Sequence, residues 1–333
     1  MEKPIRWGIL GTGKIAKAMA EGLRDTEGAE LVAIASRTVD SAQQFGAAYG
    51  VPRCHGSYQA LADDPDVDVI YIATPHPMHY ENAIMCLNAG KALLVEKSFT
   101  ITRWQAEEIV ALARAKKLFM MEAMWSRFMP AIVEAKRIVD SGEIGKPACV
   151  TADFGFAADA GPEHRLFNPE LGGGSLLDLG IYPLSLSAFF LGPVASVQAV
   201  GELGATGVDV QASFTLQHES GAVSSCLSSL RAASPCELTI SGDKGYVRLN
   251  SRFHYTNSIT VGLLDGSKTE LHIPRSGNGY PHEAAEVVRC LRAGLLESPV
   301  MPLDESVALM GILDTMRAQI GVRYSADARR QAQ

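Results

Sequence analysis

Short apolar runs alternate with amphipathic segments along roughly the first third of the chain. Segments with helical spacing of apolar residues follow two of these runs, at 79–89, which Gly90 closes, and at 104–116. Strands that alternate with helices of this length predict a parallel, doubly wound sheet with right-handed crossovers. The runs that read as buried strands lie at 5–10, 31–35, 67–73, 92–95 and 118–121.

The pattern changes after a helix predicted over 130–141 and ended by Gly142. β-Branched runs follow, separated by turn signals such as Ser220-Gly221 and Asp265-Gly266. This meander predicts a large, mainly antiparallel sheet with one face covered by helices, and we expect homo-oligomer formation, as a dimer or a tetramer, through its open face. The runs lie at 148–156, 194–202, 210–217, 223–230, 238–241, 246–250, 258–263 and 269–273.

A glycine motif joins the first strand to a helix-like segment. In Gly11-Thr12-Gly13-Lys14-Ile15-Ala16, the first glycine permits a tight turn and the second lets the backbone approach a pyrophosphate. Ala16 allows close packing of helix on strand, and the helix N-terminus faces the phosphates. The motif predicts a dinucleotide site whose ligands include Gly11, Thr12, Gly13, Lys14 and Ile15.

Ser36-Arg37-Thr38 follows the second strand, where an NAD-binding chain places an acid for the ribose hydroxyls. A carboxylate would repel a 2'-phosphate, whereas an arginine and two hydroxyls bind one through charge-assisted hydrogen bonds. We therefore expect NADP(H), with Ser36, Arg37 and Thr38 as ligands. The alternative is a solvated Arg37 with Asp40 as the acid.

The chain is 333 residues long, which fits about two domains. We predict an α/β protein: a Rossmann domain with a doubly wound parallel sheet over 1–124, and an α+β domain with the large open sheet over 125–333, for substrate binding and oligomerisation. Ligands bind beyond the carboxyl ends of parallel strands, so Thr74-Pro75 and Glu96-Lys97 are expected to face the cofactor.

Charge and composition narrow the partners. The net charge is −7 and no segment carries a clustered basic patch, so we expect no nucleic-acid partner. No apolar run approaches about 18 residues, and the start of the chain leads into a strand, so we expect no membrane partner and a cytoplasmic protein. The six cysteines are scattered, and the pair His76 and His79 lacks a third ligand, which predicts reduced thiols and no metal.

Two segments carry candidate chemistry. Lys97 emerges from the end of a buried strand, where its charge can orient substrate oxygens and stabilise an alkoxide. In the glycine-rich segment 172–183, a helix would put Asp178 and Tyr182 on one face. A phenol, with an ordinary pKa of about 10, needs a nearby ammonium to act as a base, and Lys97 is the candidate. Taken singly, Lys97 also fits a solvated strand end and Tyr182 a half-buried aromatic.

These motifs occur together, in this order and spacing, in one known family. The chain resembles the glucose-fructose oxidoreductase/inositol dehydrogenase/MocA family over nearly its whole length. Within it, the segment 121–130 and the use of Tyr182 are similar to the branch that contains dimeric dihydrodiol dehydrogenases and NADP-dependent D-xylose dehydrogenases. Ser98 departs from the family pattern, in which proline follows the lysine.

The resemblance implies hydride transfer between nicotinamide and an aldopyranose, such as D-xylose, or a cyclic vicinal diol. Tyr182 would be the acid/base, Lys97 its electrostatic partner, and Asp178 a group that orients substrate hydroxyls. Further cofactor contacts are expected from Thr74, Pro75, His79, Glu96, Lys97, Trp125 and Arg127. Substrate contacts are expected from Lys97, Trp125, Phe128, His164, Arg165, Asp178 and Tyr182.

Other interpretations stay open at this point. Trp125 and Phe128 follow the last predicted strand of the Rossmann domain, where aromatic residues also suit packing at a domain junction. The chain could be an NADP-sensing regulator without catalysis, although such a protein needs neither Lys97 nor Tyr182. It could also carry redox chemistry hidden within an epimerisation or a glycoside cleavage, with no net change in the cofactor.

Overall fold

The computed structural model describes residues 3–328, which form two compact units. The first unit contains the chain up to Trp125 together with Ser276–Val307, and the second contains Ser126–Arg275 and the residues from Ala308 onward. The division into domains at 124/125 stays a prediction. The structure adds that the chain returns to the first unit after the large sheet.

The first unit holds a six-stranded parallel sheet in the order β3-β2-β1-β4-β5-β6. The strand order reverses direction between β1 and β4, the place where doubly wound sheets bind ligands. The predicted parallel sheet is confirmed. Its strands are β1 (Ile5–Leu10), β2 (Ala29–Ala35), β3 (Arg53–His55), β4 (Val69–Ile72), β5 (Ala92–Glu96) and β6 (Met120–Ala123).

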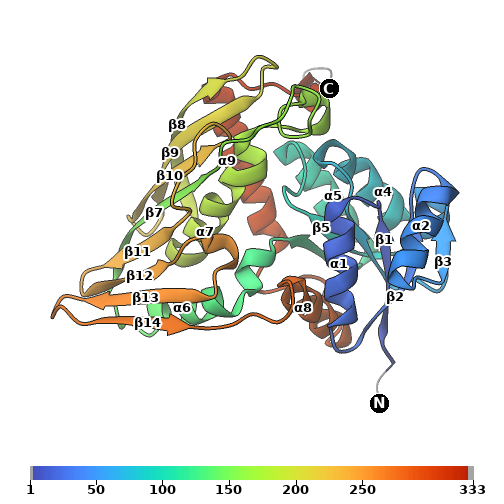
Figure 1. Ribbon diagram of the computed structural model, residues 1–333, viewed down its shortest axis with the longest axis horizontal. Helices are drawn as coiled ribbons and strands as arrows, with labels where there is room; N and C mark the ends of the chain where they lie inside the picture. The colour runs from blue at the N-terminus through green and yellow to red at the C-terminus, as the bar shows by residue number, and fades with distance from the viewer. Residues whose placement is uncertain (1–2, 329–333) are drawn as a thin grey trace. The chain divides into compact units, whose positions relative to one another are not determined.

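The helices of the first unit pack on this sheet and on one another (Figure 1). Helix α1 buries Met19 and Leu23 and packs closely on α8. Glycine at position 22 allows this approach, since a Cβ there would lie only 2.6 Å from Cβ of Tyr280. The helices are α1 (Lys14–Arg24), α2 (Val39–Tyr49), α3 (Tyr58–Ala62), α4 (His79–Asn88), α5 (Arg103–Lys116) and α8 (Tyr280–Arg292), with the short 3₁₀ turn η1 (His76–Met78). A second 3₁₀ turn, η2 (Trp125–Phe128), starts at the last residue of this part of the unit and continues into the second unit.

The second unit holds an eight-stranded sheet in the order β14-β13-β12-β11-β7-β10-β9-β8. Only the central pair β7–β10 is parallel, so the sheet is mainly antiparallel, as predicted. The strands are β7 (Pro147–Gly155), β8 (Val194–Leu203), β9 (Asp209–His218), β10 (Val223–Ser229), β11 (Leu238–Gly242), β12 (Gly245–Leu249), β13 (Ser258–Leu263) and β14 (Lys268–His272).

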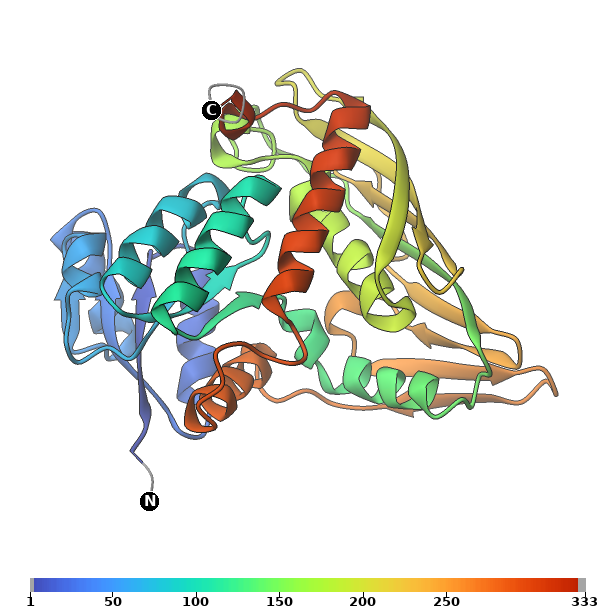
Figure 2. The same ribbon diagram turned by 180° about the vertical axis from the view of Figure 1, so that it is seen from behind.

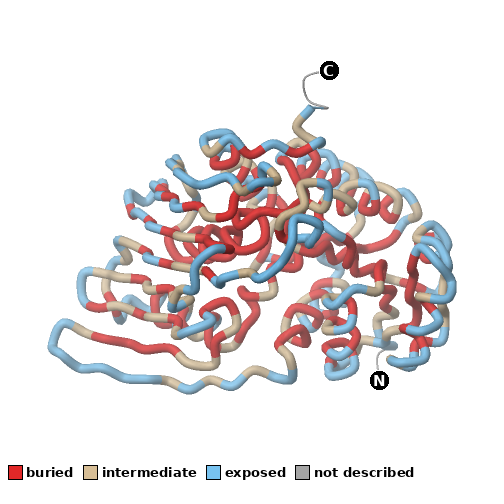
Figure 3. The backbone as a smooth tube through the Cα atoms, turned by 45° about the horizontal axis from the view of Figure 1, so that its top comes forward, coloured by how far each residue is buried: buried red, intermediate tan, exposed pale blue. Residues whose placement is uncertain are grey.

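Helices α6 (Pro130–Asp140) and α7 (Ile181–Leu191) cover one face of this sheet (Figure 2). Along β9, Phe214 and Leu216 are buried, whereas Ser213 and Thr215 on the other face are exposed. Figure 3 shows buried and exposed residues mixed along the backbone tube of the protein. Helix α9 (Leu303–Ile320) belongs to both units, and a short α10 (Ser325–Ala328) follows it.

One stretch of the described residues, 169–191, is long and apolar enough to cross a membrane. It contains the short turns η3 (Pro169–Leu171) and η4 (Leu176–Gly180) and the helix α7. Because 94% of its most apolar window is buried inside the protein, its apolarity fits a core helix under the sheet.

Candidate active site

The turn between β1 and α1 is built to admit a phosphate. Gly11 has a φ of +113°, and a Cβ there would lie 3.1 Å from the carbonyl oxygen of Ala73, so the turn needs glycine. Gly13 precedes α1 with no atom within 4 Å of its would-be Cβ, which leaves open space at the helix end. No side chain caps this helix, so its first N–H groups are available to an anion. The pyrophosphate prediction therefore fits the backbone.

The three residues predicted to bind the 2'-phosphate after β2 differ in how accessible their polar groups are. Ser36 is buried and its hydroxyl lies 3.4 Å from that of Thr12. Thr38 is already engaged, because its hydroxyl caps α2 by accepting the Ser41 N–H at 3.4 Å. Arg37 is exposed and makes no hydrogen bond or ion pair with another described residue. Arg37 is thus the charged residue of the three, and its guanidinium is available to bind a phosphate.

The loops after β4 and β5 are tied together by a histidine. His79 is fully buried, with Nε2 2.8 Å from the Thr74 carbonyl oxygen and Nδ1 3.0 Å from that of Ser98. Burial lowers the pKa of His79, and the surrounding carbonyl oxygens oppose this shift. Both ring nitrogens thus contact backbone carbonyls within the unit, so the ring supports the two loops, and its expected contact with the cofactor stays a prediction. Thr74 is buried beside it, and Pro75 is exposed.

The end of β5 presents a buried carboxylate followed by a half-buried lysine. Glu96 accepts hydrogen bonds from the Tyr71 hydroxyl and, at 3.1 Å, from the backbone N–H of Lys97. The carbonyl of Lys97 lies 3.2 Å from Nε2 of His76, and the Lys97–Ser98 peptide is cis. The backbone N–H and the backbone carbonyl of Lys97 are therefore both held by neighbouring side chains at the carboxyl edge of the sheet. Lys97 therefore follows the end of a buried strand, as the sequence predicts, and its catalytic role stays a prediction.

The aromatic and basic residues after β6 pack against different parts of the protein. Trp125 stacks on Tyr280 of α8, with ring centroids 4.7 Å apart and planes at 4°. Arg127 is fully buried in the second unit, where Nε donates to the Ser185 hydroxyl at 3.0 Å and Nη2 to the Ser185 carbonyl at 2.8 Å. The guanidinium thus anchors η2 to α7, and its expected contact with the cofactor stays a prediction. Phe128 is also buried.

Asp178, in the turn η4, is paired with the loop that precedes it. Arg165 donates to both carboxylate oxygens, at 3.0 and 3.3 Å, in the bidentate form that arginine prefers. Its neighbour Leu166 anchors the loop by packing on Leu179. His164 is exposed, and its Nδ1 accepts the Leu166 N–H. We predicted each of these three residues as a substrate contact; Asp178 and Arg165 contact each other, and the substrate contacts stay predictions.

Tyr182 lies in an aromatic cluster. Its ring centroid is 5.0 Å from that of His254 and 5.6 Å from that of Phe154, and the last two rings stack at 4.4 Å. Tyr182 and His254 are almost completely buried. This cluster places the phenol against aromatic and imidazole rings, in the same unit as the Asp178–Arg165 pair.

Comparisons with known proteins agree with this picture. A family model described as the oxidoreductase family with an NAD-binding Rossmann fold matches residues 5–124, and one for the GFO/IDH/MocA C-terminal domain matches 132–248. The chain belongs to the Gfo/Idh/MocA family. It is therefore an oxidoreductase with a nicotinamide-dinucleotide-binding domain.

Relatives cover the whole chain. The trans-1,2-dihydrobenzene-1,2-diol dehydrogenase of Mus musculus is 37% identical over 98% of this chain and 99% of its own, and that of Homo sapiens is 34% identical over the same shares. An aldose-aldose oxidoreductase from Caulobacter crescentus, complexed with glycerol, superposes with a TM-score of 0.87 at 25% identity, over 95% of this chain and 97% of that one. A 3-ketoreductase from Actinomadura kijaniata, in complex with NADP and TDP-benzene, gives 0.84 at 25% identity, over 96% and 98%.

Within this Gfo/Idh/MocA chain, the helix that carries the candidate residues begins differently from its prediction. Residues Leu176–Gly180 form a turn of π-helix, and α-helix follows from Ile181. The spacing argument for Asp178 and Tyr182 assumed α-helical geometry throughout, and a π turn changes which residues share a face. Such turns are frequent at functional sites.

Two residues of this cluster, Phe154 and His254, were not predicted from the sequence. Phe154 lies within a predicted strand, but the pattern does not reveal that it meets Tyr182. His254 lies in the 3₁₀ turn η5 (Phe253–Tyr255), where three consecutive aromatic or imidazole rings in a loop were the available signal. Within residues 3–328, no group of three or more His, Cys, Asp or Glu could hold a metal ion.

Proposed function

We propose that the protein is an NADP(H)-dependent dehydrogenase or reductase of CH–OH groups in an aldopyranose, such as D-xylose, or a cyclic vicinal diol. The observation that carries the proposal is the Tyr182 phenol set against Phe154 and His254, in the same unit as the Asp178–Arg165 pair. An aromatic wall suits the apolar faces of sugars and cyclic diols, and the polar pair suits their hydroxyls. Full-length relatives named as dihydrodiol dehydrogenases support the same substrate class.

The proposed mechanism assigns one task to each residue. Tyr182 takes the proton of the substrate hydroxyl at Oη during oxidation and returns it during reduction. The Lys97 ammonium stabilises the negative charge on oxygen as that proton leaves. Asp178, held by Arg165, orients substrate hydroxyls. A bound nicotinamide supplies the hydride acceptor or donor. Solved variants of the related 3-ketoreductase include one with a lysine changed to alanine and one with a tyrosine changed to phenylalanine.

NADP(H) is the proposed cofactor because of charge at the end of β2. Gly13 leaves room for the pyrophosphate at the start of α1, which serves NAD and NADP equally. Arg37 is exposed and unpaired among the described residues, and a 2'-phosphate would give it an anionic partner. The alternative acid, Asp40, lies in the first turn of α2.

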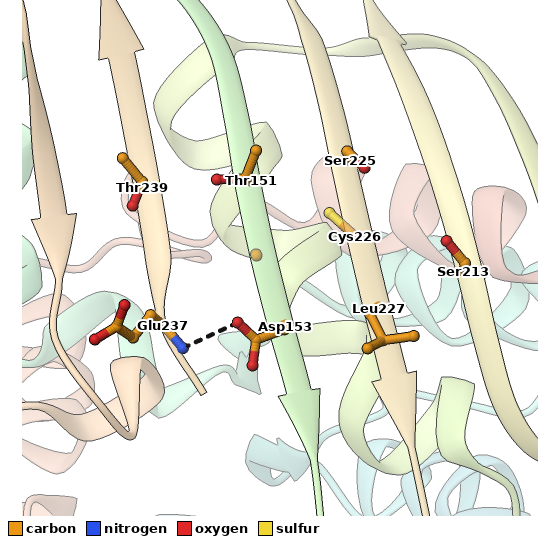
Figure 4. Close-up of a pocket in the computed structure, with 9 residues that line it drawn as sticks. Thr151, Asp153, Ser213, Ser225, Cys226, Leu227, Glu237 and Thr239 are labelled. Carbon is orange, nitrogen blue, oxygen red and sulfur yellow. Dashed lines mark hydrogen bonds between the residues drawn. The ribbon is translucent and has the colours of Figure 1, made fainter. Parts of the chain in front are cut away.

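We also propose that the protein forms a homo-oligomer through the open face of the large sheet. Thr151, Ser225 and Thr239 lie side by side there on neighbouring strands and line a shallow depression with Asp153 and Glu237 (Figure 4). Size-exclusion chromatography with light scattering tests this, because a monomeric mass contradicts it. A cytoplasmic location is proposed in addition, and it is supported by six cysteines that are all free.

Absorbance at 340 nm tests the catalytic proposal. The protein is assayed with NADP and with NAD against D-xylose, D-glucose, other aldoses, inositols and a trans-dihydrodiol. We expect NADP reduction with one of these classes. Preference for NAD contradicts the cofactor assignment. The proposal is contradicted if absorbance at 340 nm does not change with any substrate, in oxidation or in reduction, although fluorescence shows that NADPH binds. That result favours an NADP sensor or hidden redox chemistry.

A further inference from the structure

The glycine-rich segment that leads into the candidate helix encloses a buried carboxylate. Asp209, the first residue of β9, is fully buried. Its Oδ2 accepts the Ser175 hydroxyl and the Leu176 backbone N–H, both at 2.7 Å. These two donors stand at the start of η4, so a strand of the sheet holds the first turn of the helix that carries Asp178 and Tyr182.

The surroundings of Asp209 are built around the carboxylate. The Ser175 hydroxyl also lies 2.9 Å from that of Ser228 on β10, which fixes its direction. Gly174 has a φ of +122°, and a Cβ there would lie 2.4 Å from Oδ1 of Asp209. The Tyr324 hydroxyl donates to the Gly173 carbonyl and closes the other side. The third glycine of the run is thus required by the close approach of the carboxylate.

Asp209 is not placed for stability alone. Its Oδ1 has no hydrogen-bond partner among the described residues, so the burial of this carboxylate costs free energy. Burial raises the pKa of Asp209 to about 6, against the opposing effect of the Ser175 and Leu176 hydrogen bonds. A neutral side chain would avoid the free-energy cost of burying a charge. An ionised carboxylate instead makes stronger, charge-assisted hydrogen bonds to the start of the helix.

We propose that Asp209 is a positioning residue for the reaction, which holds η4 and thereby sets where Asp178 and Tyr182 present their polar groups. The inference rests on the proposed role of Tyr182. When Asp209 takes up a proton, its two bonds to Ser175 and Leu176 lose their charge assistance and the hold on the helix start weakens. Activity therefore falls as this carboxyl is protonated.

The groups facing Asp209 do not titrate in the same range. Tyr324 is the titratable side chain next to it, and burial raises its pKa, which keeps it neutral. Arg317 lies over the Tyr324 ring and is paired with Asp314 and Asp327. The contacts from β10 and from the helix start are hydroxyls and a backbone N–H.

The test compares the intact enzyme with Asp209→Asn and Asp243→Asn between about pH 5 and about pH 8, a window that spans the Asp209 titration. Asp243 is the control because it also accepts a backbone N–H, that of Lys146 at 2.9 Å, in an exposed turn away from the helix. We expect the wild type and Asp243→Asn to lose kcat below a pH of about 6, the pKa of Asp209. Asp209→Asn should lack this acid limb and have a kcat lower by about tenfold, since a misplacement of ~1 Å can cost ~10²-fold. NADPH affinity should be unchanged.

Ser175→Ala keeps the test decisive if Asp209→Asn fails to fold. It removes one bond that lowers the pKa of Asp209, so the acid limb should move to higher pH, which general destabilisation would not cause. Wild-type kcat and an unmoved acid limb in both variants overturn the inference. Tyr182→Phe, assayed in parallel, separates the two proposals: if it is inactive while both variants behave as wild type, only the positioning role of Asp209 fails, and if it keeps full activity, the proposed role of Tyr182 fails.

Discussion

Changing Arg37 to alanine should weaken NADPH binding and leave NADH binding nearly intact. Arg37 is exposed at the carboxyl end of β2, without a hydrogen bond or ion pair to another described residue. Its neighbour Thr38 is already used as the cap of α2. Most of the interaction with a 2'-phosphate therefore has to come from the Arg37 guanidinium.

The size of the effect follows from the chemistry of this exposed position. A hydrogen bond to a charged group contributes about 1.5–3 kcal/mol, and solvent screening at an exposed site keeps the value toward the low end. Since about 1.4 kcal/mol corresponds to a tenfold change in Kd, the loss for NADPH should be about 10- to 30-fold. No such loss applies to NADH, which lacks the 2'-phosphate.

Fluorescence titration of the protein with NADPH and with NADH measures both affinities. Arg24→Ala is a matched control, because Arg24 is an exposed arginine of the same unit that is paired with Asp25. Raising the salt concentration should reduce the difference between the wild type and Arg37→Ala, as screening weakens the contact. Equal losses for the two cofactors, or an unchanged Kd for NADPH, would refute the 2'-phosphate reasoning and favour Asp40 as the ribose ligand.

Two further predictions concern stability. Glu283 is fully buried, and burial, followed by the charge of Glu96, raises its pKa well above the usual range. The native state therefore keeps this proton where the unfolded state has lost it, and stability falls by up to about 1.4 kcal/mol per pH unit above about pH 4.5. Glu283→Gln should lessen this fall and be more stable than the wild type at pH ~8 but not at pH ~5. Urea unfolding measures this, and a difference in the free energy of unfolding between the two proteins that is the same at both pH values would contradict it. Gly174→Ala should lower the melting temperature through about 1–3 kcal/mol of backbone strain and the clash with Asp209, whereas Gly161→Ala, with no atom within 4 Å of its would-be Cβ, should not; equal melting temperatures would count against the described geometry.

Periodicity predicted the fold because each strand has a definite pattern. The exposed and buried residues alternate along β9 as the run 210–217 suggests, and the buried parallel strands appear as continuous apolar runs. The predicted strand at 118–121 begins two residues later, as β6, because Met120 is the first residue to pair with β5. Leu118 and Phe119 are as apolar as the residues that follow, so hydrophobicity alone does not locate this boundary.

The candidate site was only partly predictable. Lys97 could be placed because a strand end fixes the direction of the chain. The destination of Arg127 could not, because its bonds go to Ser185, 58 positions further along the chain. Asp209 carries no local motif, and the three rings at 253–255 do not reveal that His254 meets Tyr182, because both contacts depend on packing between distant segments. Such long-range contacts are set by tertiary structure, which single-sequence patterns do not contain.

The central claim is that Tyr182 transfers the proton in an NADP(H)-dependent reaction, and Tyr182→Phe tests it most directly. The change removes one hydroxyl and keeps the ring that packs against Phe154 and His254. Steady-state turnover of the best substrate from the panel should fall by about 10²- to 10⁴-fold, the range of general acid–base catalysis, with the Kd for NADPH unchanged. Turnover at the wild-type rate would contradict the account.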